Sequence, residues 1–285
     1  MLAEWLDILM DALIDSIKLF PFLLLTYLLM EYLEHKTSTK TRAWIRKAGR
    51  MGPIAGGVAG IFPQCGFSVA ASNLYSGGII TMGTLVAVFL STSDEMLPIF
   101  LSEAVNGRII LKVLGIKLVT AVFTGFIVDF VMRFRPNAIQ YKDFHTMCES
   151  EHCHCEKSIG KSAFIHTFKI LLFIFLCSLV LNFLIEIGGE ERISEFLSSH
   201  AMFGPVFAAI VGLIPNCAAS VLITQMYLGG ILDFGSMISG LLVGAGVGLL
   251  VLFRTNKRWK ENLSILGIVW VAGVFWGVIV NLLIH

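Results

Sequence analysis

The stretch "GIFPQCGFSVA" (residues 60–70) interrupts an apolar run with a proline, an amide, a thiol and a glycine. A second stretch, "GLIPNCAASVL" (residues 212–222), repeats the interruption 152 positions later. Proline removes a backbone donor and breaks a helix. Backbone groups freed inside a bilayer must be buried in protein or face a polar cavity. The two stretches therefore predict paired broken or re-entrant helices around an internal site.

Composition places the chain in a membrane. Of its 285 residues, 56% are hydrophobic and only 14% are charged, whereas a soluble domain carries about 25% charged residues. The charges cluster and leave long apolar runs that can span a bilayer. We therefore expect an all-α polytopic membrane protein. The net charge of +1 gives no sign of a nucleic-acid partner.

The chain contains an internal repeat. Residues 52–101 align with residues 204–253 without a gap, and 113–133 with 265–285, at the same offset. Chance similarity between apolar runs is the alternative, but shared proline, cysteine and Gly-Gly positions favour duplication. We expect repeat one at 1–134, a linker at 135–159 and repeat two at 160–285. The shared positions include Pro63 and Pro215, Cys65 and Cys217, Tyr75 and Tyr227, and the pairs 77–78 and 229–230.

Loop charges predict that the two repeats have opposite orientations. The loop at 35–50 is rich in Lys and Arg, whereas its counterpart at 188–201 has one Arg and three Glu. The loops at 102–107 and 254–262 show the reverse bias, with no Lys or Arg in the first and four in the second. Because basic loops stay in the cytoplasm, this predicts inverted repeats with both termini outside. Inversion needs an odd number of crossings per repeat, which the broken segments can supply.

The motifs "GIFPQCGFS", "GLIPNCAAS" and "STSDEMLPIF" (residues 91–100) resemble those of the bacterial ten-helix heavy-metal exporters. That family is also labelled manganese transporter or arsenic-efflux-like permease. The resemblance covers nearly the whole chain. It implies a multi-pass permease of the inner membrane, with about five helices in each of the two repeats, and a transporter rather than an enzyme.

An acidic pair and the two polar interruptions form the predicted substrate site. Asp94 and Glu95 lie late in an apolar run, where an ionisable side chain is a functional candidate by default; the alternative is a place among headgroups. An amide and a thiol follow each proline, and both are ordinary ion ligands. The alternative is that they only cap the broken helices. The predicted ligands are Asp94, Glu95, Gln64, Cys65, Asn73, Asn216, Cys217 and Gln225.

Two further polar groups have predicted accessory roles. Four charged or titratable residues lie at matching positions in the first helix of each repeat. They either anchor the helices at the membrane interface or take part in proton coupling and gating. They are Asp15, Lys18, His166 and Lys169. The linker "HTMCESEHCHCEK" (residues 145–157) has the His/Cys-rich composition of a labile metal site, or is only a solvated linker. Its candidate ligands are His145, Cys148, His152, Cys153, His154 and Cys155.

These observations predict a secondary-active exporter of a divalent transition-metal ion, manganese(II), working from the cytoplasm by alternating access. The expected partners are the lipid bilayer, the metal substrate, protons as counter-ion and a second copy of the chain; no resident cofactor is expected. One alternative is a permease for arsenic species, organic or oxyanionic, with Cys65 and Cys217 as soft ligands. Another is a membrane metal sensor that uses the His/Cys linker without transport.

Overall fold

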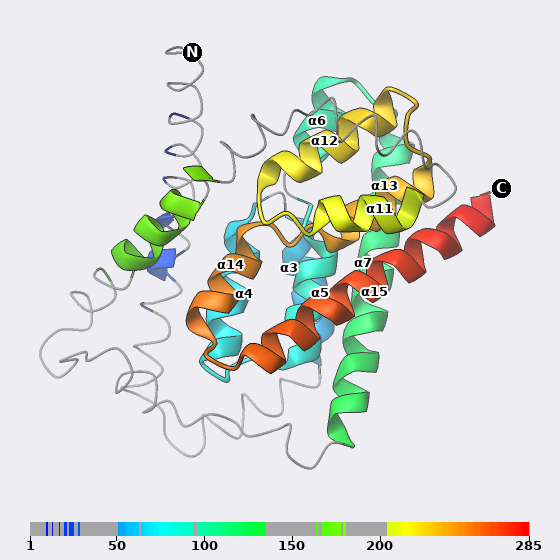
Figure 1. The fold of residues 1–285 in the computed structure, drawn as a ribbon. Coiled ribbons are helices and arrows are strands. Elements are labelled where there is room, and N and C mark those ends of the chain that lie inside the picture. Colours follow the sequence, from blue (N-terminus) through cyan, green and yellow to red (C-terminus); the bar gives the residue numbers. More distant parts are fainter. Residues whose placement is uncertain are drawn as a thin grey trace, which may run out of the picture.

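The computed structural model describes residues 51–62, 64–93, 96–134 and 204–284, with scattered residues in 10–28 and 164–180. This part of the chain is helical and contains no strand (Figure 1). Four stretches within it are long and apolar enough to cross a membrane, in agreement with the predicted polytopic protein: Met82–Ser102, Gly107–Arg133, Phe234–Thr255 and Trp259–Leu283. The helices are α3 (Gly52–Ile61), α4 (Gly66–Ser76), α5 (Met82–Ser91), α6 (Met96–Ser102), α7 (Gly107–Arg133), α11 (Gly204–Gly212), α12 (Cys217–Leu228), α13 (Phe234–Val243), α14 (Val247–Thr255) and α15 (Trp259–Ile284).

Each proline–cysteine stretch separates two short helices. α3 has Pro53 in its first turn, where the missing N–H leaves no bond unmade. It ends at Phe62, whose extended backbone is the conformation favoured before a proline. α4 then begins after Cys65. In the second half, α11 ends at Gly212 and α12 begins at Cys217, so the interruption falls at the corresponding place.

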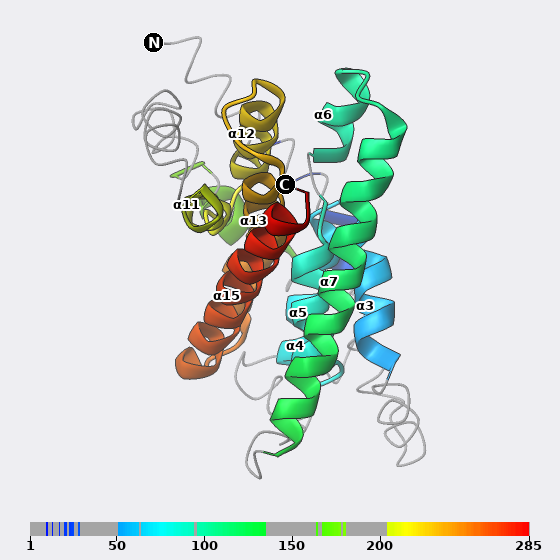
Figure 2. The ribbon, with the colours of Figure 1, turned by 90° about the vertical axis from the view of Figure 1, so that its right-hand side faces the viewer.

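Close packing between glycines and their neighbours makes both helix pairs re-entrant. A Cβ on Gly52 would overlap Thr84 near the start of α5, and one on Gly60 would overlap Ser91 at its end, so α3 runs parallel to α5. α4 connects α3 to α5 in the chain, so it must run in the opposite direction to both. Gly204 and Gly212 approach α13 in the same order, so α11 and α12 form a second hairpin. Figure 2 shows α4 toward one end of the molecule and α12 toward the other.

The paired glycines of the repeat close both hairpins by one turn. Gly78 and Gly230 have φ angles of 72° and 73°, a left-handed conformation that other residues adopt only at a cost. The amide of Ile79 then donates to Leu74 O at 2.9 Å, which satisfies a carbonyl at the end of α4. Both turns lead directly into the next long segment, so the exit of each hairpin determines where α5 and α13 begin.

A second pair of interruptions lies in segments that the sequence analysis treats as continuous. α5 ends at Ser91 and α6 begins at Met96, while α13 ends at Val243 and α14 begins at Val247. Gly246 has a φ of 54°, which glycine alone adopts easily. Residues 91–93 are Ser-Thr-Ser and residues 244–246 are Gly-Ala-Gly, all of them poor helix formers except alanine. These weak helix formers are the sequence feature that predicts each break. The residues around them are apolar, so each segment reads as one continuous span.

The last helix of each half is anchored to the start of the broken segment. Asp129 Oδ1 in α7 accepts a bond from the Gly83 amide of α5 at 2.8 Å. Asn281 Oδ1 in α15 accepts from the Gly235 amide of α13 at 3.0 Å. The residues of the second bond lie 152 positions after those of the first. Both bonds satisfy backbone amides at the start of a helix, which have no partner within the helix.

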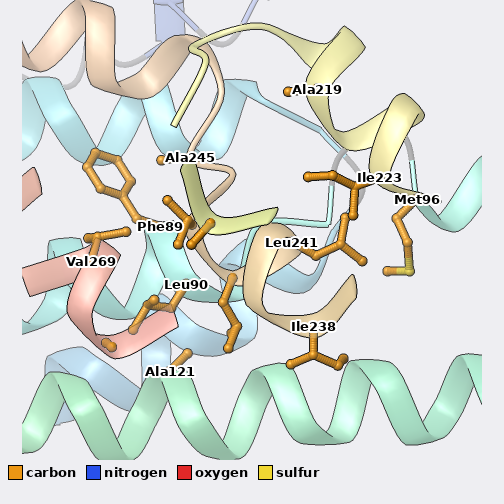
Figure 3. Close-up of a cluster of buried hydrophobic side chains, with 14 of the residues drawn as sticks. Phe89, Leu90, Met96, Ala121, Ala219, Ile223, Ile238, Leu241, Ala245 and Val269 are labelled. Atoms are coloured by element: carbon orange, nitrogen blue, oxygen red, sulfur yellow. The ribbon is translucent and has the colours of Figure 1, made fainter. Parts of the chain in front are cut away.

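One hydrophobic core joins the two halves. Figure 3 shows side chains from α5, α6, α7, α12, α13 and α15 in a single cluster. Phe89 and Leu241 are almost completely buried, and Met96 and Ile223 are buried in the same cluster. A smaller cluster packs Leu23 and Ile174, from the first segments of the two halves, against α4 and α14. Packing of this kind makes the two halves one body rather than two separate domains.

We predict that Gly60→Ala destabilises the protein, because the new methyl would overlap Ser91 and lie 2.7 Å from Val88 O. Overpacking of a close helix contact costs about 1–3 kcal/mol. Thermal unfolding in detergent measures the effect. Gly115→Ala in α7 is the matched control, since nothing lies within 4 Å of its added Cβ. Equal unfolding temperatures for the two variants would contradict the parallel packing of α3 and α5.

Candidate functional site

The tips of the re-entrant hairpins lie beside the breaks in the long segments. The end of α3 packs against the end of α5, where the first break begins. The start of α4 packs against the start of α14, where the second break ends: a Cβ on Gly248 would lie 2.7 Å from the Ser68 side chain. Ser72 Oγ donates to Gly248 O at 2.7 Å. The first hairpin therefore touches both breaks.

The second hairpin makes the corresponding contact on the other side. α12 packs against α6, as α4 packs against α14. Tyr227 at the end of α12 has its ring 6.3 Å from that of Phe100 in α6, centroid to centroid. Broken and re-entrant backbone thus converges from both halves on one region within the helical body. Interruptions of this kind are where transporters bind their substrates.

The residues at the two tips differ in exposure although their sequences match. Gln64 is exposed and Cys65 is half-buried, whereas Asn216 and Cys217 are buried. The local backbone is nevertheless the same, because Ser68 Oγ donates to Cys65 O and Ser220 Oγ to Cys217 O, both at 2.8 Å. The tips offer amide, thiol and backbone oxygen groups, a mixture of hard and soft ligands.

The paired amides further along the hairpins do not lie in equal surroundings. Asn73 is completely buried in α4. Gln225, at the matching position of α12, is exposed. Lys169 in the first segment of the second half is exposed as well. Of these three residues, Asn73 alone is buried, whereas Gln225 and Lys169 are exposed.

Several predicted residues lie outside the described residues. They are Asp94 and Glu95, the first-helix residues Asp15, Lys18 and His166, and the linker residues 145–155. The chain on either side of the acidic pair is described: Thr92 and Ser93 are buried, and Met96 starts α6. Within the part of the chain that the structure describes, no three His, Cys, Asp or Glu side chains come together as a metal cluster.

A buried lysine at the centre was missed by the sequence analysis. Lys117 lies in the middle of α7 and is fully buried. Its ammonium donates to Thr92 O, and to Leu241 O at 2.9 Å. These carbonyls come from the first break and from the last turn of α13, so one cation joins the broken segments of both halves. The signal was an isolated lysine in an apolar span, which membrane energetics marks as a functional candidate.

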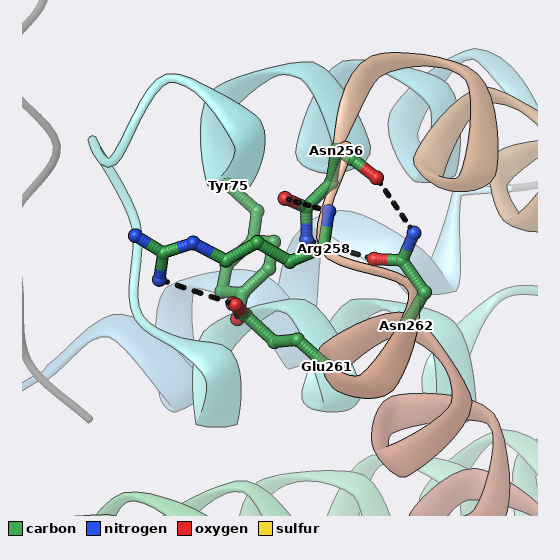
Figure 4. A network of polar contacts seen from close by, with 5 residues as sticks. All are labelled: Tyr75, Asn256, Arg258, Glu261 and Asn262. Atoms are coloured by element: carbon green, nitrogen blue, oxygen red, sulfur yellow. Dashed lines mark hydrogen bonds and ion pairs between the residues drawn. The ribbon is translucent and has the colours of Figure 1, made fainter. Parts of the chain in front are cut away.

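A polar network ties α4 to the turn between α14 and α15 (Figure 4). Tyr75 Oη donates to Glu261, whose other carboxylate oxygen lies 3.3 Å from the Arg258 guanidinium. Asn256 and Asn262 are buried and hydrogen-bond each other, with Nδ2 of the first 2.7 Å from Oδ1 of the second. At the other end of the molecule, the matching Tyr227 packs against the aromatic rings of Phe100 and Phe234. The two tyrosines, although at matching positions, therefore have different partners.

Comparison with protein families identifies the chain. The family described as "Putative, 10TM heavy-metal exporter" matches residues 4–190 and 173–285. The chain belongs to this family. No match is found among curated proteins or among solved structures.

Family membership confirms the resemblance that the motifs indicate. The exporter family is one of multi-pass membrane proteins in metal transport, not one of enzymes. Together with the four apolar spans, it makes this chain a multi-pass membrane protein of a heavy-metal export family.

We predict that Cys65 reacts faster than Cys217 with a thiol reagent, because Cys65 is half-buried whereas Cys217 is 8% exposed. The measurement uses two variants, each retaining one of these thiols, with the other cysteines replaced by serine. The two thiols occupy matching positions after a proline, so each serves as the control for the other. Equal rates in the folded protein would contradict the different burial of the two tips.

Proposed function

We propose that the chain is a secondary-active exporter that moves a divalent transition-metal ion, manganese(II), out of the cytoplasm by alternating access. The observation that carries the proposal is the convergence of two re-entrant hairpins on two broken helices inside a heavy-metal exporter. Backbone carbonyls at such breaks can replace the hydration shell of an ion. Carboxylate, carbonyl and amide oxygens suit manganese(II), because hard ligands select hard cations.

Two inverted repeats, 1–134 and 160–285 with a linker at 135–159, supply the moving parts in this proposal. Trp276 Nε1 donates to Thr124 Oγ1 at 3.0 Å, and these residues occupy matching positions 152 apart. A residue that touches its own counterpart lies close to the axis relating two copies. The exchanged contacts of α4 with α14 and of α12 with α6 support the same symmetry.

The ion site combines the tips with the acidic pair. Asp94 and Glu95 follow Thr92 in the sequence, at the first break. In the proposal their carboxylates neutralise the ion, and the tip residues Gln64, Cys65, Asn216 and Cys217 complete its shell with the amides Asn73 and Gln225. Protons exchange at the carboxylates as counter-ions. Asp15, Lys18, His166 and Lys169 act in gating, and the linker residues 145–155 hold a labile metal on the cytoplasmic side.

A permease for arsenic species is the second candidate. The paired thiols at the tips favour it, because Cys65 and Cys217 sit at matching places where the hairpins reach the breaks. Thiolates are soft ligands and arsenic is a soft acceptor. Adjacent carboxylates in the first break disfavour an anionic substrate. The two candidates therefore assign the binding energy to different side chains.

We predict that Asp94→Asn lowers manganese(II) binding by more than about tenfold, because the affinity of a hard cation depends on ligand charge. Cys65→Ser should cause only a modest loss, since it exchanges a soft ligand for a hard one. Counterflow in proteoliposomes over a panel of metals and arsenicals measures both effects. Both variants must first show wild-type unfolding temperatures. Normal transport by the Asp94 variant with an inactive Cys65 variant would favour the arsenic permease.

We predict that a cysteine placed at Lys257 resists an impermeant maleimide in intact cells and reacts in inside-out vesicles. The reason is that the basic loop at 254–262 is cytoplasmic in the proposed topology, with both termini outside the inner membrane. A cysteine at Glu103, in the exposed loop before α7, is the control and should react in intact cells. Labelling of the Lys257 position from outside would rule out the inverted arrangement.

A further inference from the structure

Lys117 lies at the meeting point of the broken segments, where its amino group donates to Thr92 O and Leu241 O. It is fully buried, in the middle of a helix that spans the membrane. The charged residues of α7 other than Lys117 lie toward its two ends. A lysine in such a place costs free energy unless its ammonium has strong partners.

Two groups that accept hydrogen bonds from the ammonium are carbonyls at helix ends. Thr92 is the C-cap of α5 and Leu241 lies in the last turn of α13, where carbonyls have no partner within the helix. Helix C-termini carry a partial negative charge, so both ends attract a cation. Converging carbonyls from broken helices are also the groups that coordinate ions in transporters. The Lys117 ammonium therefore occupies a place with the chemistry of a cation site.

We propose that the Lys117 ammonium is a tethered substitute for the transported ion, which holds the two broken segments together when the site is empty and is displaced when a metal cation binds. This inference rests on the proposed export function. It explains how an unloaded carrier keeps a positive charge against the carbonyl ends while it returns. The matching residue of the second half is the buried Val269, so the structure has one such cation among its described residues.

Competition between the tethered ammonium and the ion has a measurable consequence. When only a fraction of a protein is in the form that can bind a ligand, the apparent affinity is reduced in proportion to that fraction. Removing the ammonium should therefore tighten metal binding. It should also slow net efflux, which needs the empty carrier to return, while exchange of metal for metal continues.

The test compares Lys117→Met with the wild type in full-length purified protein. We expect manganese(II) binding, measured by calorimetry, to tighten on the order of tenfold in the variant. In proteoliposomes we expect net efflux to fall while manganese exchange is retained. Methionine keeps the approximate length of the side chain, and the unfolding temperature of the variant is measured first because removing one buried charge can destabilise a protein. Lys117→Gln, which still donates to the carbonyls, replaces it if the methionine variant does not fold.

Two control variants separate the tethered cation from other roles. Lys112→Met removes an exposed charge from the same helix and should change neither affinity nor efflux. Lys117→Arg keeps the charge and should not tighten binding. A folded Lys117→Met variant with unchanged or weaker manganese binding would overturn the inference. If that variant instead lost binding of an arsenic oxyanion that the wild type binds, Lys117 would be an anion ligand. A wild type that moves no metal contradicts the export function itself.

Discussion

Backbone carbonyls that leave a helix inside a membrane must find donors within the protein, because hydrocarbon provides none. This chain breaks its helices repeatedly within the described residues. Local hydroxyls such as that of Ser91 supply some of the donors at the breaks, and other elements supply the rest. Lys117 donates to Thr92 O at the end of α5 and to Leu241 O in the last turn of α13, and Ser72 of α4 donates to Gly248 O just after the second break. Each bond links a segment to one distant in the sequence. The breaks therefore hold the two halves together as well as interrupting them.

Glycine makes the hairpins possible by letting backbones come close. Gly60 packs against the end of α5, and Gly212 packs against the backbone of Gly240 in α13. A side chain at either place would separate the hairpin from the broken segment. The tip would then lie away from the break. Close packing at glycine thus allows each hairpin to lie directly against a broken segment.

The two halves have the same scaffold but different chemistry. Both anchor their last helix through the same amide position, with Asp129 in one and Asn281 in the other. Lys117 in the first half corresponds to the apolar Val269 in the second. Tyr75 meets a carboxylate, whereas Tyr227 meets aromatic rings. Matching positions of the two halves therefore meet different partners.

The sequence alone determined that the chain is helical, lies in a membrane and interrupts itself at two matching places, because prolines, Gly-Gly pairs and long apolar runs act locally. It also determined the family, since the motifs extend along nearly the whole chain. The second pair of breaks escaped detection because apolar neighbours mask a few weak helix formers such as Ser91 and Gly244. Only the tertiary structure brought Lys117 together with Thr92 and Leu241, and only it separated buried Asn73 from exposed Gln225. Burial and through-space partners depend on how the helices pack, and sequence spacing within one helix does not specify the residues that a second helix places opposite.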